Sequence, residues 1–265
     1  SRGLGDVYKR QNPDKVVTGV AIGQNAYARS GSVMVGTHNF KGKLYDTTVD
    51  TSDIANMRSN NVVVNATTVG TNSWNNAAFG VVNGAYSAIT GAYDGGGFRP
   101  NSAQNFGATI TGSLNSIESK TASSNYSGIA NSIVGVANRT FNSNGSLIYG
   151  AGNEITNSVE DIYSAPTSGG NSPEALAQNL RRVIKESNGG GSTMAFGGGN
   201  RADYTLRTAM IGVNNTVTGT SRRSSTYNSI TGFKNVATNV NHVSIIGSEN
   251  EIENTDDALV LGNKR

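Results

Sequence analysis

The chain contains no cysteine, only four prolines and two histidines, and few apolar or charged residues for its 265 positions. The absence of cysteine excludes disulfides, cysteine-ligated zinc and thiol chemistry. Hydrophobic residues make up 35% of the chain and charged residues 15%, which is too little apolar material for a thick two-layer core. No apolar run approaches the roughly 18 residues of a membrane-spanning helix, and no signal peptide opens the chain.

Glycine is abundant instead, at 34 residues, about twice its usual share. Chains of low hydrophobicity are often disordered, but disorder normally accompanies a high net charge, and here the formal charge is only +3. A chain that is rich in Gly, Asn, Ser and Thr without strong charge indicates regular turns. Because 21 basic residues barely exceed 18 acidic ones, we expect no basic face for nucleic acid.

One pattern recurs along most of the chain: a short apolar run, then a glycine, then an asparagine three residues later. Ser146–Ile155, Thr208–Val217, Asn228–Ala237 and Val243–Ile252 are clear copies. Four spacings between successive glycines are 15 residues, and gaps of 20 to 47 indicate insertions. The anchoring glycines are Gly23, Gly36, Gly70, Gly80, Gly91, Gly112, Gly135, Gly150, Gly197, Gly212, Gly232, Gly247 and Gly262. We therefore divide the chain into an unrelated tail, residues 1–15, and one repetitive domain, residues 16–265.

Each apolar run is too short for a helix and rich in β-formers, so it predicts a strand. The glycine relieves crowding where the chain bends, and the asparagine suits a tight turn because it tolerates the left-handed conformation. An aliphatic residue after the asparagine starts a second strand. We expect an all-β solenoid with two short strands and two turns per coil, and polar ladders of stacked asparagines such as Asn235 and Asn250. The structural turn residues are Gly23, Gly36, Gly80, Gly150, Gly212, Gly247, Asn39, Asn153, Asn215 and Asn250.

Many copies contain two or three consecutive apolar residues, such as Val33–Val35 and Leu259–Leu261. Strand side chains alternate between faces, so such runs place apolar groups on both faces. One face can fill the coil interior, and the other needs a partner. We favour self-association about a long axis; the alternative is a lone solenoid covered by an insertion.

The Ser-apolar-x-apolar-Gly units resemble the head domains of trimeric autotransporter adhesins, the YadA-like heads of Gram-negative bacteria. Gly19–Gly23 and Ser32–Gly36 are the closest units, and the resemblance spans about Val16 to Arg265. It implies a left-handed parallel β-roll, a homotrimer and display on the outer membrane at the cell surface. It also implies attachment to a host receptor or matrix protein, such as collagen, fibronectin or a CEACAM-type receptor. The repeats here are often longer than in simple heads, and no stalk or anchor follows Arg265, so any membrane attachment would come through an anchor outside this chain.

Loops on a rigid scaffold carry function more often than the scaffold does. We place insertions at about residues 41–61, 93–104, 156–191 and 218–227. The second presents Phe98 and Arg99 after three glycines, and the fourth carries Arg222 and Arg223. These side chains, with Arg181 and Arg182 of the third insertion, are the candidate ligand-binding residues.

The third insertion contains the one convincing helix. Ser172 suits its N-cap, Pro173 its first position, and Asn188-Gly189 its end. An apolar stripe lies along one face, formed by Leu176, Leu180, Val183 and Ile184. We expect this stripe to dock on the solenoid or on a neighbouring subunit; the sharper hypothesis is a receptor-binding knob.

The sequence offers little catalytic chemistry. His38 and His242 sit in or beside repeat turns, and no Ser–His–acid set follows from them. The acidic residues of 251–257 lack the calcium-binding repeat pattern. We expect no enzyme activity, cofactor or metal. Besides the adhesin head, two functions stay open: a spacer in a longer surface fibre, and a phage fibre segment or β-helical glycan-cleaving enzyme.

Overall fold

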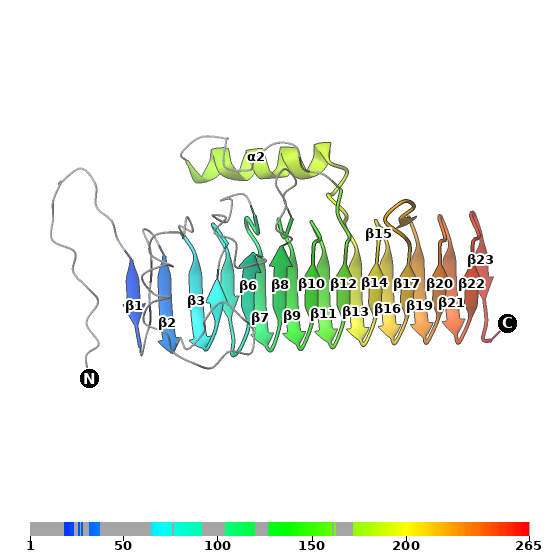
Figure 1. The fold of residues 1–265 in the computed structure, drawn as a ribbon, viewed down its shortest axis with the longest axis horizontal. Coiled ribbons are helices and arrows are strands. Elements are labelled where there is room, and N and C mark those ends of the chain that lie inside the picture. The colour runs from blue at the N-terminus through cyan, green and yellow to red at the C-terminus, as the bar shows by residue number, and fades with distance from the viewer. Residues whose placement is uncertain are drawn as a thin grey trace.

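The chain folds into an elongated parallel β-solenoid with one helix lying over it (Figure 1). The structure is a computed structural model, and it describes residues 19–23, 26, 28, 32–37, 65–75, 77–91, 104–119, 127–160, 162 and 172–264. Each complete coil gives one strand to each of two long sheets, and successive coils pair in parallel. The predicted all-β solenoid with one short helix is confirmed for these residues. Asn39, Phe98, Arg99 and the insertion at 41–61 lie outside them.

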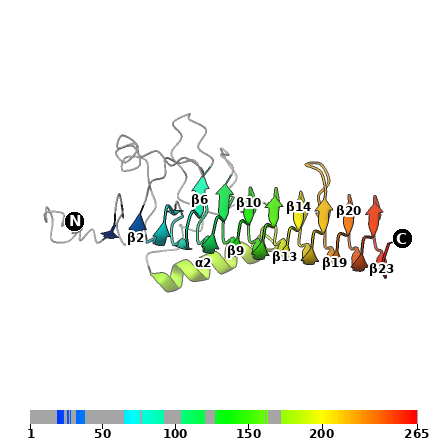
Figure 2. The same cartoon turned by 90° about the horizontal axis from the view of Figure 1, so that it is seen from below.

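The two long sheets run along opposite faces of the rod (Figure 2). The first sheet consists, in spatial order, of β1 (Val20–Ile22), β2 (Val33–Thr37), β3 (Thr67–Thr71), β5 (Val81–Asn83), β7 (Thr109–Ser113), β9 (Ser132–Val136), β11 (Leu147–Ala151), β13 (Met194–Gly198), β16 (Ala209–Val213), β19 (Ser229–Phe233), β21 (Ser244–Ser248) and β23 (Leu259–Leu261). The second consists of β4 (Trp74–Asn75), β6 (Ala88–Gly91), β8 (Ser116–Ser119), β10 (Arg139–Phe141), β12 (Glu154–Thr156), β14 (Arg201–Asp203), β17 (Thr216–Thr218), β20 (Val236–Thr238) and β22 (Glu251–Glu253).

The interior of each coil is thin, because each strand of the two sheets contributes about one inward-pointing core side chain. The second residue of each first-sheet strand points inward and meets the middle residue of the second-sheet strands. Ile133, Ile148, Ile230 and Ile245 from the first sheet and Ile155 from the second are fully buried. This thin, continuous core explains how a chain with 35% hydrophobic residues folds.

Each coil has three sides: the two strands per coil that we predicted form the two long sheets, but our prediction of two turns per coil is wrong. The coil between Gly232 and Gly247 turns at three left-handed residues: Lys234 (φ 51°), Asn239 (φ 52°) and His242 (φ 52°). The third side is short: it holds β15 (Thr205–Leu206), β18 (Ser225–Thr226) and the bridges that join Thr226, Asn241 and Asp256. It lacks the β-forming runs that marked the other two sides.

The strand-end glycines stack into a column along the first sheet. Gly150 has φ of 145°, and a Cβ placed on it would lie 1.7 Å from the carbonyl oxygen of Gly197. The same close approach repeats from coil to coil, so no residue with a side chain fits. The column comprises Gly23, Gly36, Gly70, Gly84, Gly112, Gly135, Gly150, Gly197, Gly212, Gly232, Gly247 and Gly262.

Two predicted anchors, Gly80 and Gly91, are misplaced, and Gly84 takes the position that we gave to Gly80. Gly80 lies in the turn before β5, where its amide donates to the Ala77 carbonyl at 3.0 Å. Gly91 is the last residue of β6, in the second sheet. Gly84 belongs to the column, because a Cβ placed on Gly70, in the preceding coil, would lie 1.6 Å from the carbonyl oxygen of Gly84.

The repeat asparagines form a buried ladder behind the glycine column. The side-chain amide of Asn215 donates to Asn200 Oδ1 at 3.0 Å and to the Gly232 carbonyl at 2.9 Å, and the backbone amide of Asn215 donates to the same Oδ1. The ladder comprises Asn115, Asn138, Asn153, Asn200, Asn215, Asn235 and Asn250. Ser87 holds the corresponding position before it, since its hydroxyl donates to Gly112 and accepts from the Asn115 amide.

These asparagines do not adopt the left-handed conformation that we expected of them. The residue before each one does: Asn214 (φ 54°), Lys234 (φ 51°) and Glu249 (φ 58°). Because the bend falls one residue earlier, the asparagine side chain points into the coil and reaches its neighbours on both sides.

The helix α2 (Pro173–Glu186) lies along the third side of the rod (Figure 1). Ser172 caps its N-terminus by accepting from the Ala175 amide, and Ser187 ends it one residue before the Asn188 that we predicted. Val183 is buried and Leu180 half-buried against a cluster formed by Ala78, Phe106, Ile129 and Ala130 on the third sides of earlier coils, and by Ile162 of the third insertion itself. The stripe therefore docks on the solenoid, as one of our two alternatives expected. In Figure 2 the helix also extends past the edge of the first sheet.

Candidate interaction surface

The outer face of the first sheet carries most of the exposed apolar side chains of the described residues. Residues one, three and five of each strand point outward there. Twelve of the sixteen exposed large hydrophobic side chains belong to these positions, and none belongs to the second sheet. We call this surface the apolar face: Val20, Ile22, Val69, Val81, Val136, Tyr149, Ile211, Val213, Phe233, Ile246, Leu259 and Leu261.

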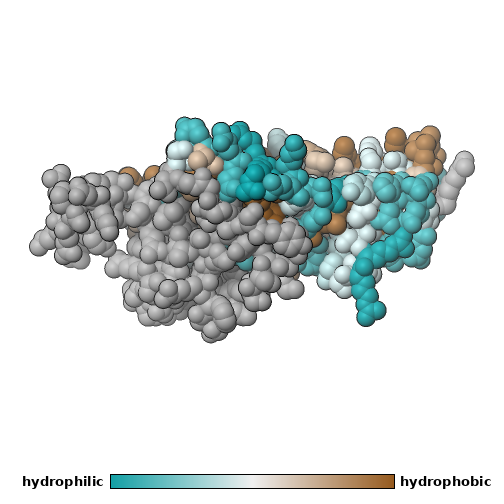
Figure 3. Space-filling view, turned by 90° about the horizontal axis from the view of Figure 1, so that it is seen from above, coloured by the Kyte–Doolittle hydropathy of each residue, from teal (hydrophilic) through white to brown (hydrophobic). Residues whose placement is uncertain are grey.

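The apolar face runs the length of the rod. In Figure 3 hydrophobic residues recur along one long edge of the view, with polar residues between them. Exposures are high for such side chains, 59% for Tyr149, 56% for Ile246 and 66% for Leu259. Burying one half-exposed side chain of this size contributes about 1 kcal/mol, so covering all twelve contributes on the order of 10 kcal/mol per chain. That is of the order of the roughly 4–15 kcal/mol that association costs, and an apolar patch of this extent marks an interaction surface.

The second sheet presents the opposite chemistry. Arg139 lies between Glu118 and Glu154, at 3.0 Å and 2.7 Å, and Arg201 approaches Glu154 at 3.9 Å. The pKa of Arg139 lies above its usual value, chiefly because its side chain hydrogen-bonds Glu118 and then Glu154. This alternating ladder of charges suits a solvated face. The two sheets therefore differ in surface chemistry: the first exposes apolar side chains and the second a ladder of charges.

The described insertions leave the coil after second-sheet strands. The third insertion follows β12 and the fourth follows β17, so neither interrupts a strand of the first sheet. The third insertion begins after Ser158 rather than at 156, because Thr156 is the last residue of β12. The fourth is shorter than predicted, since Ser225 and Thr226 form β18.

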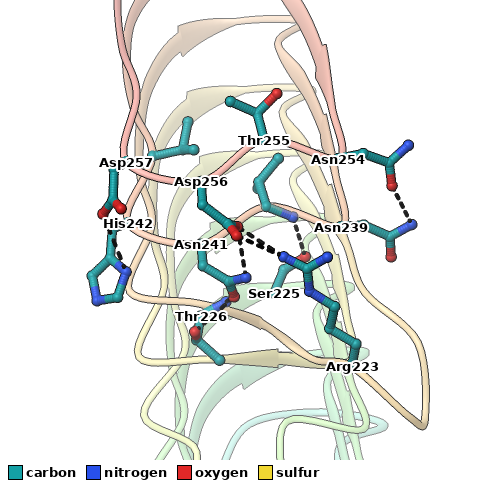
Figure 4. Close-up of polar contacts among 12 residues, drawn as sticks. Arg223, Ser225, Thr226, Asn239, Asn241, His242, Asn254, Thr255, Asp256 and Asp257 are labelled. Carbon is teal, nitrogen blue, oxygen red and sulfur yellow. Dashed lines mark hydrogen bonds and ion pairs between the residues drawn. The ribbon is translucent and has the colours of Figure 1, made fainter.

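The loop between Gly219 and Ser225 is fastened to the third side by Arg223. Its guanidinium donates to both carboxylate oxygens of Asp256, at 2.8 Å and 2.9 Å (Figure 4). Asn241 also donates to Asp256, at 2.9 Å. The Asn241 hydrogen bond, followed by the charge of Arg223, lowers the pKa of the Asp256 carboxyl. Arg223 is therefore engaged within the chain, whereas Arg222 is exposed and has no ion pair among the described residues.

A second row of side chains lies along the corner between the third side and the first sheet. Arg207 lies 5.3 Å from the Tyr227 ring centre, Tyr227 stacks on His242 at 4.9 Å, and His242 approaches Asp257 at 3.7 Å. Arg207 also pairs with Glu160 and donates to the Asn188 carbonyl, so it holds both ends of the third insertion. These contacts were not foreseen, because their members come from four different coils.

The two candidate arginines on α2 differ in the same way as Arg222 and Arg223. Arg182 pairs with Glu186 at 2.7 Å and donates to Asn179 at 2.7 Å. Arg181 is exposed, with no ion pair in the part of the chain that the structure describes.

Most of the predicted turn residues have structural positions. The glycine column contains Gly23, Gly36, Gly150, Gly212 and Gly247, and the asparagine ladder contains Asn153, Asn215 and Asn250.

The described residues contain no group of three or more potential metal ligands. None of their helices is both long and apolar enough to span a membrane. The chain matches no known protein-family model, no curated protein and no solved structure.

The third insertion is expected to be removable without loss of the solenoid. Ser158 and Gly191 are adjacent, because a Cβ on Gly191 would lie 2.8 Å from the Ser158 carbonyl carbon. Deleting residues 159–190 shortens the spacing from Gly150 to Gly197 from 47 residues to the 15 of a regular coil. We expect the variant to keep the β-sheet circular dichroism of the full chain, with a lower unfolding midpoint because Phe106 and Ile129 lose their cover. Loss of the β-sheet signal would show that the insertion is part of the scaffold.

Proposed function

We propose that this chain is the head of a trimeric surface adhesin, in which three solenoids bury their apolar faces against one another. The observation that carries the proposal is the apolar face itself, which contrasts with the charged second sheet of the same rod. The resemblance of the glycine-anchored repeat to the heads of trimeric autotransporter adhesins supports it. The proposal also includes a left-handed roll, display on a Gram-negative outer membrane and a non-enzymatic role.

The trimer predicts that one charge on the apolar face separates the subunits. Ile211, 49% exposed in the lone chain, would be enclosed by three subunits, so Ile211→Glu is expected to weaken assembly by about 3 kcal/mol or more per chain. Sedimentation should then report monomers. The matched control is Thr216→Glu in the same coil, on the second sheet beside Arg201, where a carboxylate extends the charge ladder. Trimers from both variants, or monomers from both, would contradict the proposed interface.

The adhesive function predicts that exposed cations on the insertions hold the ligand. Arg181 and Arg222 are the described candidates that are exposed without an intrachain ion pair. We expect the double variant Arg181→Ala/Arg222→Ala to bind host cells, or collagen or fibronectin, at least about tenfold more weakly while remaining folded. Arg201→Ala, on the second sheet, is the control and should bind as the unchanged chain does. Equal binding by all three proteins would remove these residues from the ligand site.

A spacer without a ligand is the second candidate. It is favoured by Arg182 and Arg223, two candidate residues that are engaged in ion pairs within the chain. Failure of the purified trimer to bind any host surface would favour this function over the adhesin.

A further inference from the structure

Two adjacent polar side chains interrupt the central part of the apolar face. The third residue of each first-sheet strand forms a central outward column, and nine of its twelve members are apolar, from Ile22 at one end to Leu261 at the other. Asn83 and Thr111 are consecutive polar members, paired in register on neighbouring strands. The third polar member, Thr231, stands alone between Ile211 and Ile246.

The side chains of Asn83 and Thr111 make no stabilising polar contact with the described residues of their own chain. Both are exposed, and neither side chain has a hydrogen-bond partner among the described residues. Thr109, on the same strand as Thr111, is different, because its hydroxyl bonds to Ser132 at 3.0 Å. Neither residue is needed for the fold of the strand, since Val69 and Val134 fill the equivalent positions on either side.

The same coils are supported from another direction. Ala78, Phe106 and Ile129, which precede β5, β7 and β9, form the seat of α2. Coils that α2 stabilises from the third side can accept polar groups on the first sheet at less risk to the fold.

We propose that Asn83 and Thr111 form a polar layer that sets the register of the trimer. This inference rests on the proposed trimer. With three chains aligned, the three Asn83 amides and three Thr111 hydroxyls face their own copies and can hydrogen-bond across the axis. When one chain is displaced along the axis, at least one of the two lies against Val69 or Val134 of a neighbour and is buried without a partner. A polar residue in an apolar interface fixes register in this way at some cost in stability.

The test replaces both residues with valine and measures stability and register together. Valine fits the strand, so Asn83→Val/Thr111→Val is expected to fold and to raise the dissociation temperature of the trimer by about 5 °C or more. Register is measured by disulfides, since the chain has no cysteine of its own. Proteins carrying Ile211→Cys and Ile246→Cys, two coils apart, are mixed, unfolded, refolded together and oxidised.

In the unchanged background only like cysteines should join, because unlike ones lie about 10 Å apart along the axis, beyond the reach of a disulfide. In the valine background, disulfides between Ile211→Cys and Ile246→Cys chains should appear. The inference is overturned if the valine variant forms like pairs only, or if its dissociation temperature falls. A monomeric mass for the unchanged protein would instead reject the trimer, which separates the two failures.

Discussion

Gly197→Ala is expected to destabilise the chain by about 4 kcal/mol or more, enough to unfold it or leave it marginal. Gly197 has φ of 123°, and an added Cβ would lie 2.0 Å from the carbonyl oxygen of Gly212 in the next coil. That atom is backbone, held in register by the strands on both sides, so it can move only if the coils separate.

The control is the next residue in the chain. A Cβ on Gly198 would meet its nearest atom, the Ala151 carbonyl oxygen, at an ordinary 3.6 Å, and Gly198 does not have a positive φ. Gly198→Ala should therefore change the free energy of unfolding by less than about 1 kcal/mol. Urea unfolding followed by circular dichroism compares the two, and similar midpoints for both variants would contradict the stacking of the glycine column.

Asn200→Ala is expected to have the next largest effect, about 3–5 kcal/mol. Asn200 is fully buried, donates to Asn153 Oδ1 at 2.9 Å and to the Gly212 carbonyl at 2.8 Å, and accepts from Asn215 twice at 3.0 Å. Alanine leaves these groups without partners and out of reach of water.

Two further variants separate lost hydrogen bonds from lost volume. Asn200→Asp keeps the size of the side chain but removes the amide donor, so it should also destabilise strongly at pH 7, and less at pH 3, where a protonated carboxyl can donate. Asn254→Gly, at an exposed left-handed corner (φ 49°), should change the free energy of unfolding by less than about 0.5 kcal/mol. If Asn254→Gly destabilises as much as Asn200→Ala, the buried ladder has no special role.

The sequence predicted the parts of this fold that repeat at short range. Apolar–glycine units such as Ser229–Gly232 identified first-sheet strands, and the asparagine three residues later identified the buried ladder. The helix was predictable because Ser172, Pro173 and the apolar stripe are local signals.

The predictions failed where a residue's position depends on how distant coils align. Phe79-Gly80 resembles an apolar–glycine unit more closely than Asn83-Gly84 does, yet only Gly84 aligns with Gly70 and Gly112. The third side was missed because its members change character along the rod, from Phe106 under α2 to Asp256 near Arg223.

The apolar face was predicted from the sequence, but its contrast with the opposite sheet was not. Consecutive apolar residues indicated that a second face needs a partner. The charge ladder that marks the opposite sheet as solvated could not be found, because Glu118 and Arg139 are 21 positions apart across an insertion. Only the alignment of coils brings them together.

The most direct test is the mass of the purified chain in solution, measured by sedimentation equilibrium over a range of concentrations. Burial of the apolar face in a trimer predicts three times the 27.5 kDa of one chain. A folded monomer at every concentration would show that the apolar face stays exposed, and would contradict both the trimer and the function built on it.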